Sequence, residues 1–328
     1  MRITVLGAGA WGTALAINFA RHQEVKLWAR DPAQVAIMAS ERQNRRYLTD
    51  CLFPPALATT ADIVEALTDA ELIIVAAPLS GLRATLELLR DNQSTVPFLW
   101  VCKGLERGTG LLPHQVVREV LGDVQCGVLT GPSFAEELAR DLPTVVTIAA
   151  KDADFALHCA ENLHSRSLRI YASNDVVGAE IGGAVKNVMA IATGICDGLG
   201  LGLNARAALL TRGLAEITRF GVAMGAKQTT FMGLSGMGDL FLTCTGDLSR
   251  NRRVGLMIAQ GKPLEQITRE LGHVAEGVPA AQEVKRRAEA LSISMPITDF
   301  VCAVLDGVLS PMEGVAALMT RDIGFEKL

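Results

Sequence analysis

The feature that most constrains this chain is a glycine-rich turn between a short β-rich run at residues 2–6 and a helix-prone run that follows it. The turn reads Gly7-Ala-Gly9-Ala-Trp-Gly12 and matches the pattern G-x-G-x-x-G. In a strand–turn–helix unit, Gly7 permits the tight turn, Gly9 lets the backbone approach a pyrophosphate, and Gly12 allows close helix–strand packing. The helix N-terminus offers N–H groups and a positive dipole end to phosphates. The pattern therefore predicts a dinucleotide-binding βαβ unit.

The same region has a second interpretation, because residues 3–20 carry no charge and could be mistaken for a signal peptide or membrane anchor. Three glycines and Asn18 interrupt the stretch, so it lacks the continuous apolar segment that such a peptide requires. The glycine-rich turn explains these residues better. We therefore expect no membrane insertion.

Beyond the turn, the first half of the chain alternates short apolar runs with helical patterns such as residues 81–90 and 112–121. Short strands separated by helices indicate a mostly parallel sheet that is covered on both faces. The expected strands are residues 2–6, 24–29, 72–76, 97–102, 126–130, 144–149 and 167–171.

After about residue 174 strand-like runs largely vanish, and helical stretches rich in small residues replace them. The predicted fold is α/β, with a Rossmann-type, mostly parallel sheet domain at residues 1–173 and an all-helical C-terminal domain at residues 174–328. The expected helices of the second domain are residues 176–196, 206–225, 252–260, 280–291 and 297–305.

Charge and cysteine usage exclude several classes of protein. The formal net charge of -4 argues against a nucleic-acid partner, whose phosphates demand a basic face. The seven cysteines are dispersed and form no C-x-x-C pair, which indicates reduced thiols and a cytoplasmic location. No two of them share a zinc-ligand spacing, so we expect no metal site.

Cofactor choice depends on the end of the second expected strand. An acidic residue there would bind the ribose 2′-hydroxyl of NADH, whereas an arginine would accommodate the 2′-phosphate of NADPH. Arg30 precedes Asp31, and Arg45 and Arg46 lie in the next loop, which favours NADPH over NADH. Asp31 could instead cap a helix that begins at Pro32.

Lys186 is the most informative single residue, because residues 181–196 contain no other charged side chain. Such a lysine either extends its ammonium group to solvent or has a chemical role. Burial and a nearby cation both lower an ammonium pKa, which would suit a lysine that donates a proton to a developing alkoxide. The sequence leaves both alternatives open.

Two further residues are candidates for the same site. Lys103 directly follows an expected strand, where open α/β sheets bind ligands, although it could equally be a solvated loop lysine. Asp239 follows the glycine-rich segment at residues 232–238 and is either a helix N-cap or a carboxylate that holds a lysine or a substrate hydroxyl.

A third candidate segment, Gly131-Pro-Ser133, closes another expected strand. Ser133 and Glu136 fit a capping box at the start of the next helix, and the same helix end could also face a substrate phosphate.

The last candidate is Ser249-Arg250-Asn251-Arg252-Arg253, which groups a hydroxyl, an amide and three guanidinium groups. Guanidinium groups bind phosphate oxygens in a bidentate manner, although such a cluster is often only a solvated face.

The ordered set of motifs resembles that of bacterial NAD(P)-dependent glycerol-3-phosphate dehydrogenases over nearly the full length of the chain. Each motif alone could arise by chance, but their order is specific to that family. The motifs are GAGAWGTALA at 7–16, KGLE at 103–106, GPSFAEE at 131–137, GGAVKNV at 182–188, NAR at 204–206, TRGLAE at 211–216, GMGDL at 236–240, LTCT at 242–245, SRNRR at 249–253 and MPIT at 295–298.

The resemblance implies reduction of dihydroxyacetone phosphate to sn-glycerol 3-phosphate by a cytoplasmic homodimer that supplies phospholipid synthesis, with NADPH as cofactor and NADH also accepted. Lys186 would be the general acid/base, Lys103 would contact substrate and cofactor, and Asp239 would support them. The remaining substrate-binding residues would be Gly131, Ser133, Ser249, Arg250 and Asn251. The cofactor would be lined by Gly7, Gly9, Ala10, Trp11, Gly12, Arg30, Lys103, Ala135, Arg250, Val274 and Glu276.

Two rival functions predict less of this motif set. A two-domain hydroxy-acid dehydrogenase would share the dinucleotide-binding half but would not need the cluster that begins at Ser249. A non-catalytic dinucleotide sensor would bind cofactor without turnover and would leave Lys186 inert.

Overall fold

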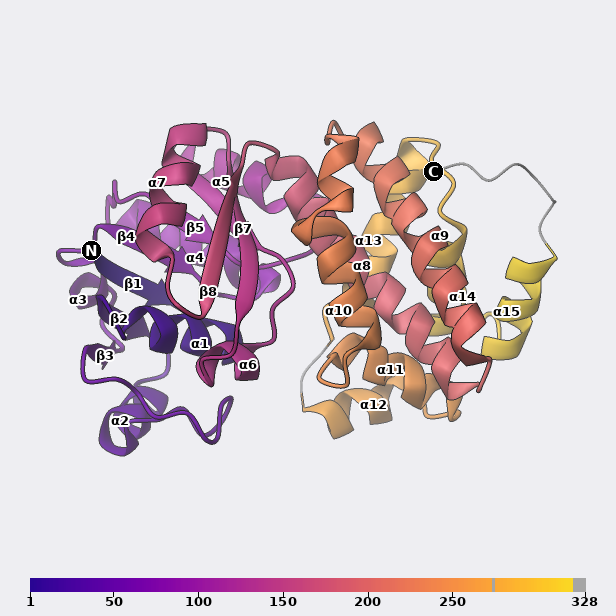
Figure 1. The fold of residues 1–328 in the computed structure, drawn as a ribbon, viewed down its shortest axis with the longest axis horizontal. Helices are drawn as coiled ribbons and strands as arrows, with labels where there is room; N and C mark the ends of the chain where they lie inside the picture. Colours follow the sequence, from indigo (N-terminus) through magenta and orange to yellow (C-terminus); the bar gives the residue numbers. More distant parts are fainter. Residues whose placement is uncertain (273–274, 321–328) are drawn as a thin grey trace. The chain divides into compact units, whose positions relative to one another are not determined.

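A computed structural model describes residues 1–272 and 275–320 of the chain (Figure 1). The chain divides into two compact units. The first comprises Met1–Cys102 and Pro113–Val176, and the second comprises Lys103–Leu112 together with the chain from Val177 onward. The sequence predicts a single division after residue 173, whereas the structure also assigns the short segment Lys103–Leu112 to the second unit.

The first unit contains an eight-stranded sheet in the order β3-β2-β1-β4-β5-β6-β7-β8. All neighbouring strands are parallel except β6 and β7, so the predicted mostly parallel Rossmann-type sheet is confirmed. The edge strand β3 was not expected, because its sequence Leu-Ala-Thr-Thr lacks an apolar run. The strands are β1 (Arg2–Leu6), β2 (Glu24–Trp28), β3 (Leu57–Thr60), β4 (Leu72–Val75), β5 (Phe98–Trp100), β6 (Cys126–Thr130), β7 (Thr144–Ala150) and β8 (Leu168–Ser173).

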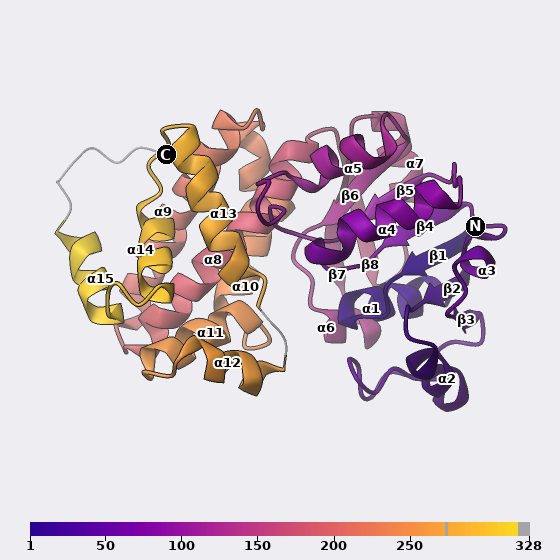
Figure 2. The same cartoon turned by 180° about the vertical axis from the view of Figure 1, so that it is seen from behind.

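Helices cover both faces of this sheet. Figures 1 and 2 show α4 and α5 on the face opposite α7, as expected for a sheet whose strands are apolar on both sides. The helices of the first unit are α1 (Ala10–Phe19), α2 (Pro32–Glu41), α3 (Ile63–Leu67), α4 (Leu79–Asp91), α5 (Pro113–Leu121), α6 (Ala135–Ala139) and α7 (Ala153–Leu163).

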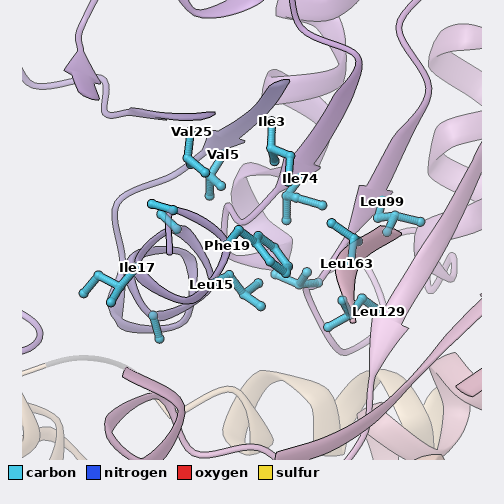
Figure 3. Packing of buried hydrophobic residues seen from close by; sticks show 14 of the residues in the cluster. Ile3, Val5, Leu15, Ile17, Phe19, Val25, Ile74, Leu99, Leu129 and Leu163 are labelled. Carbon is cyan, nitrogen blue, oxygen red and sulfur yellow. The ribbon is translucent and has the colours of Figure 1, made fainter. Parts of the chain in front are cut away.

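Buried apolar side chains on one face of the sheet form a continuous cluster with the helices that cover it. Figure 3 shows Leu15 and Phe19 of α1 packed with Ile74 of β4, Leu129 of β6 and Leu163 of α7. The helix that follows the glycine-rich turn is therefore fixed by buried side chains along almost its whole length. This packing holds the turn itself in a defined position.

The second unit is helical, which confirms the predicted all-helical C-terminal domain. Its central helix α8 (Figures 1 and 2) is the one helix among the described residues that is long and apolar enough to cross a membrane, but 89% of the qualifying window is buried. Such burial is typical of the core helix of a globular domain. The helices are α8 (Val176–Gly198), α9 (Gly202–Ala223), α10 (Asp239–Thr245), α11 (Arg250–Ala259), α12 (Leu264–Leu271), α13 (Gly277–Ala290), α14 (Pro296–Leu305) and α15 (Pro311–Met319), with a 3₁₀ turn at Gln228–Met232 and a π-helical turn at Leu234–Gly238.

Candidate active site

The glycine-rich turn has the backbone that its sequence predicts. Gly7 lies in the left-handed region with φ of 123°, which a residue with a side chain rarely adopts. A Cβ on Gly12 would lie 2.1 Å from the carbonyl oxygen of Gly7, so this position is closed to any larger residue. A Cβ on Gly9, in contrast, would meet no atom of the chain within 4 Å. This open space at Gly9 is consistent with the predicted close approach of the backbone to a pyrophosphate.

These two glycines give a matched pair of variants. Gly9→Ala is expected to leave the thermal midpoint unchanged, because the methyl group has room in the chain, but to crowd a bound dinucleotide. Crowding that costs about 1–3 kcal/mol should weaken binding of NADPH by roughly 5- to 150-fold, as measured by calorimetry. Gly12→Ala is expected instead to lower the thermal midpoint, because the added Cβ meets the backbone. Unchanged dinucleotide binding in Gly9→Ala would show that the phosphates do not approach this turn.

Asp31, which follows β2, was predicted either to bind a ribose hydroxyl or to cap a helix. Its carboxylate accepts the N–H of Ala33 at 3.0 Å and is the N-cap of α2, with Pro32 in the first helical turn. The capping interpretation is therefore confirmed. Arg30, the preceding residue, is exposed.

Lys186 lies in the middle of α8 and is only 7% exposed, so its side chain does not extend to solvent. Its Nζ donates to Asp239 Oδ1 at 2.5 Å and to the hydroxyl of Thr243 at 2.9 Å. The Thr243 hydroxyl in turn donates to the carbonyl oxygen of Asp239 at 2.6 Å. An ammonium group buried in an apolar helix is thus kept in place by a carboxylate and a hydroxyl.

Asp239 is fully buried and is the first residue of α10, whose N-cap is Gly238. The N-cap interpretation of Asp239 is therefore wrong, because the chain enters the helix one residue earlier and the carboxylate is occupied by two lysines. Its second oxygen, Oδ2, accepts from Nζ of Lys103 at 2.7 Å. One carboxylate thereby joins cations from α8 and from Lys103–Leu112, and the solvated-loop interpretation of Lys103 is also wrong.

The electrostatics of this cluster depress the basicity of Lys186. Burial is the largest cause, and the positive charge of Lys103 adds to it, while Asp239 opposes both. Together they lower the pKa of Lys186 from 10.5 to about 8. A lysine with this pKa both donates and accepts a proton near neutral pH, as acid–base catalysis requires.

The segment that carries Lys103 is anchored by a glutamate that no sequence motif indicates. Glu283 of α13 accepts the N–H of Gly108 at 2.8 Å and pairs through its other oxygen with Arg286. Leu105 and Leu112 are buried in the apolar core of the second unit. No sequence signal links α13 to this loop, because the contact joins residues 175 positions apart.

The side chains of the cluster that begins at Ser249 make different contacts. Ser249 caps α11 by accepting the N–H of Arg252. Asn251 is buried; it donates to Asn187 Oδ1 at 3.0 Å and accepts the N–H of Gly277 at 2.9 Å. The side chain of Asn251 therefore ties α11 to α8 and α13, and Asn187, which follows Lys186 directly, belongs to the same network.

The three arginines of this cluster have different surroundings. Arg252 forms ion pairs with Asp197 at 2.8 Å and Asp247 at 2.9 Å, so its guanidinium group supports the fold. Arg250 and Arg253 are exposed. Consecutive residues of a helix point in different directions, so Arg252 faces an ion pair while Arg250 and Arg253 face solvent.

Glycines fix α11 against the helix of Lys186. A Cβ on Gly194 of α8 would lie 2.1 Å from the carbonyl oxygen of Arg252, and one on Gly255 of α11 would lie 2.1 Å from that of Ile191. The two helices therefore cross in close backbone contact. This crossing sets the position of the first turn of α11 relative to α8.

Three further predicted residues, Gly131, Ser133 and Ala135, lie around the start of α6. The Ser133 hydroxyl donates to the carbonyl oxygen of Gly131 at 3.0 Å, and the N-cap of α6 is Phe134 without a side-chain hydrogen bond. The capping-box prediction for Ser133 and Glu136 is therefore wrong, because α6 begins one residue later than expected. Ala135 is the first residue of α6.

The predicted cofactor residues near α13 are only partly described. Glu276 precedes α13 as its N-cap, and burial raises the pKa of its carboxyl group. Val274 lies outside the described residues.

Both halves of the chain match models of known protein families. The family model of the NAD-dependent glycerol-3-phosphate dehydrogenase N-terminus matches residues 2–156 and includes the glycine-rich turn. The model of the C-terminus matches residues 175–316 and includes Lys186 and Asp239. The chain belongs to the NAD-dependent glycerol-3-phosphate dehydrogenase family.

Individual members of the glycerol-3-phosphate dehydrogenase family resemble the chain throughout its length. The glycerol-3-phosphate dehydrogenase [NAD(P)+] of Dechloromonas aromatica (strain RCB) is 57% identical over 323 residues, which cover 98% of each chain. That of Aromatoleum aromaticum is 56% identical and covers 98% of this chain and 99% of its own. A crystal structure of glycerol-3-phosphate dehydrogenase from Coxiella burnetii superposes with a TM-score of 0.93 at 40% identity and covers 98% of this chain and 99% of that one.

Proposed function

We propose that this chain reduces dihydroxyacetone phosphate to sn-glycerol 3-phosphate with NADPH, and also accepts NADH. The observation that carries the proposal is the buried cluster of Lys186, Asp239 and Lys103 in a chain of the glycerol-3-phosphate dehydrogenase family. The cytoplasm is the proposed location, a homodimer the proposed assembly, and glycerol 3-phosphate for phospholipid synthesis the proposed product use.

The first unit fits a dinucleotide. The open space at Gly9 and the start of α1 at Ala10 offer backbone N–H groups and a positive helix end to a pyrophosphate. Trp11 lies within this turn and Arg30 follows β2, and both are assigned to the nucleotide, together with Ala135 at the start of α6. When bound, the nicotinamide supplies the hydride that reduces the carbonyl carbon.

In this proposal Lys186 transfers the proton. Its ammonium group has three N–H bonds, of which Asp239 and Thr243 accept two among the described residues. The third is assigned to the carbonyl oxygen of dihydroxyacetone phosphate. As the carbonyl carbon is reduced, the N–H bond breaks, the O–H bond of the product alcohol forms, and the neutral amine regains a proton from solvent.

Asp239 and Lys103 keep this acid functional. The buried carboxylate between two ammonium groups leaves the cluster with one net positive charge, which would attract the developing negative charge on the substrate oxygen. Lys103 is assigned a second role as a contact for substrate and cofactor. Gly131 and Ser133 are assigned to the substrate, as the family resemblance implies.

The substrate phosphate is assigned to the first turn of α11. Arg250 is exposed at this helix end and offers a bidentate donor, while the helix N-terminus supplies backbone N–H groups. Ser249 and Asn251 would contribute by shaping this turn, since their side-chain oxygens already accept N–H groups of the chain. A phosphate held here would orient the carbonyl carbon for reduction.

The two directions of the reaction are expected to depend oppositely on pH. Reduction needs the protonated amine, so kcat/KM for dihydroxyacetone phosphate should fall about tenfold per pH unit above the Lys186 pKa of about 8. Oxidation needs the neutral amine, so kcat/KM for glycerol 3-phosphate should rise with pH and level off above that value. Initial rates in both directions between about pH 6 and 10 test this. Parallel profiles would contradict a lysine acid/base.

The assignment of the reaction is tested by cofactor oxidation, followed by absorbance, with dihydroxyacetone phosphate as substrate and a 2-keto acid as control. Turnover with the triose phosphate and not with the keto acid is the expected result. Turnover with the keto acid would favour a hydroxy-acid dehydrogenase. Cofactor binding without any turnover would favour a sensor.

A further inference from the structure

The loop that follows α2 is attached directly to the glycine-rich turn. Asn44 is only 1% exposed, and its Nδ2 donates to the carbonyl oxygen of Ala8 at 2.9 Å and to the hydroxyl of Thr13 at 2.8 Å. Ala8 lies between the first two glycines of the turn, and Thr13 lies in the first turns of α1. One buried amide thereby joins the loop to both sides of the predicted pyrophosphate site.

Other contacts make this attachment rigid. Gln34 of α2 donates to the same carbonyl oxygen of Ala8 at 3.3 Å. The carbonyl oxygen of Asn44 accepts the N–H groups of Tyr47 at 3.1 Å and of Leu48 at 2.8 Å, and Leu48 is buried in the core of the first unit. The backbone of residues 45 and 46 is therefore held in a closed turn beside the glycine-rich segment.

The two side chains on this closed turn are both cationic and exposed. Arg45 pairs with Glu41 at 3.0 Å in a surface ion pair, which contributes little and exchanges readily for another anion. The guanidinium group of Arg46 lies over the ring of Tyr47. The Asp31 carboxylate, the acidic group at the end of β2, is meanwhile occupied as the cap of α2.

We propose that residues 44–46 form the part of the cofactor site that selects NADPH. Arg45 and Arg46 bind the 2′-phosphate of the adenosine ribose, and Asn44 is a positioning residue that locks their loop onto the glycine-rich turn. This inference rests on the proposed function and deepens it, because it assigns a selectivity that the glycine-rich turn itself does not provide. A phosphate held by guanidinium groups gains charge-assisted, bidentate hydrogen bonds that a ribose hydroxyl does not offer.

The double variant Arg45→Ala/Arg46→Ala tests the selectivity. Loss of charge-assisted bonds to one phosphate is expected to lower kcat/KM for NADPH by about 10- to 100-fold, while kcat/KM for NADH stays within about twofold of its original value. Arg90→Ala is the matched control, an exposed arginine near the end of α4, and should change neither value. Equal losses with both cofactors, or no loss with NADPH, would overturn the proposal.

Binding without turnover separates this inference from the proposed function. Calorimetry on the full chain with 2′,5′-ADP and with 5′-AMP should show tighter binding of the 2′-phosphorylated nucleotide, and the double variant should abolish the difference. If the wild-type chain lacks triose phosphate turnover but keeps this difference, the proposed function fails and the selectivity stands. If the difference is absent in the wild type, the selectivity proposal fails.

Asn44→Ala tests the positioning role. Loss of its two hydrogen bonds should raise KM for both cofactors but lower the NADPH-to-NADH ratio of kcat/KM, because the arginines lose their fixed position. A variant that is less stable but keeps the wild-type ratio would overturn the positioning role. If this variant does not fold, Thr13→Val, which removes the acceptor of one of the two Asn44 hydrogen bonds, provides the same ratio test.

Discussion

Lys186→Ala is expected to lower kcat for dihydroxyacetone phosphate reduction by about 10²–10⁴-fold, the usual contribution of a positioned general acid. The fold should survive, because Asp239 keeps Lys103 as a partner at 2.7 Å and is not left as an unpaired buried charge. Steady-state kinetics, with circular dichroism and a thermal midpoint, measure both outcomes. A small primary amine added to the assay should restore part of the activity if the missing group is a proton donor.

Two controls separate proton transfer from charge. Lys186→Arg keeps a cation, but a guanidinium group does not release its proton at neutral pH, so this variant should be nearly as inactive as Lys186→Ala. Lys262→Ala removes a lysine that pairs with Glu270 on the surface and should leave kcat unchanged. An active Lys186→Arg enzyme would mean that positive charge alone matters.

Asp239→Asn is expected to affect stability and pH dependence together. It removes the carboxylate that the buried ammonium group of Lys186 shares with the partly buried one of Lys103, and loss of one partner of a buried ion pair costs about 3–5 kcal/mol of unfolding free energy. Because the attraction of Asp239 opposes the lowering of the Lys186 pKa, that pKa should fall further below about 8. The decline of the reduction rate should therefore begin at lower pH than in the wild type.

The sign of the stability change with pH provides a further check. A lysine whose folded pKa lies below its unfolded value makes the unfolded state bind more protons between those two values, so stability rises with pH in that range. In Asp239→Asn the folded-state pKa of Lys186 is lower still, so the pH range over which stability rises begins at lower pH. The loss of unfolding free energy relative to the wild type should therefore be larger at low pH than above pH 8, as measured by urea unfolding. Asp247→Asn is the control, since that carboxylate is almost fully exposed and its pairing with Arg252 contributes little. Equal losses in both variants would contradict a special role for Asp239.

Much of the fold was predictable because the signals are local. Residues 2–6 and 126–130 coincide with β1 and β6, since short apolar runs between turn residues are typical of buried strands. β3 was missed because an edge strand needs no apolar run, and the antiparallel direction of β7 leaves no mark in its sequence. Capping was harder to predict, since a shift of one residue moved the N-cap from Ser133 to Phe134.

The sequence by itself determined the glycine-rich turn, the division into a sheet unit and a helical unit, and the isolation of Lys186 in an apolar helix. These features depend on neighbours within a few residues, where periodicity and steric limits act. Only the tertiary structure decided that Asp239 joins Lys103 to Lys186, that Arg252 serves an ion pair, and that Asn44 holds the turn. Each of these contacts joins residues far apart in the sequence, and their partners are set by packing, which no local pattern encodes.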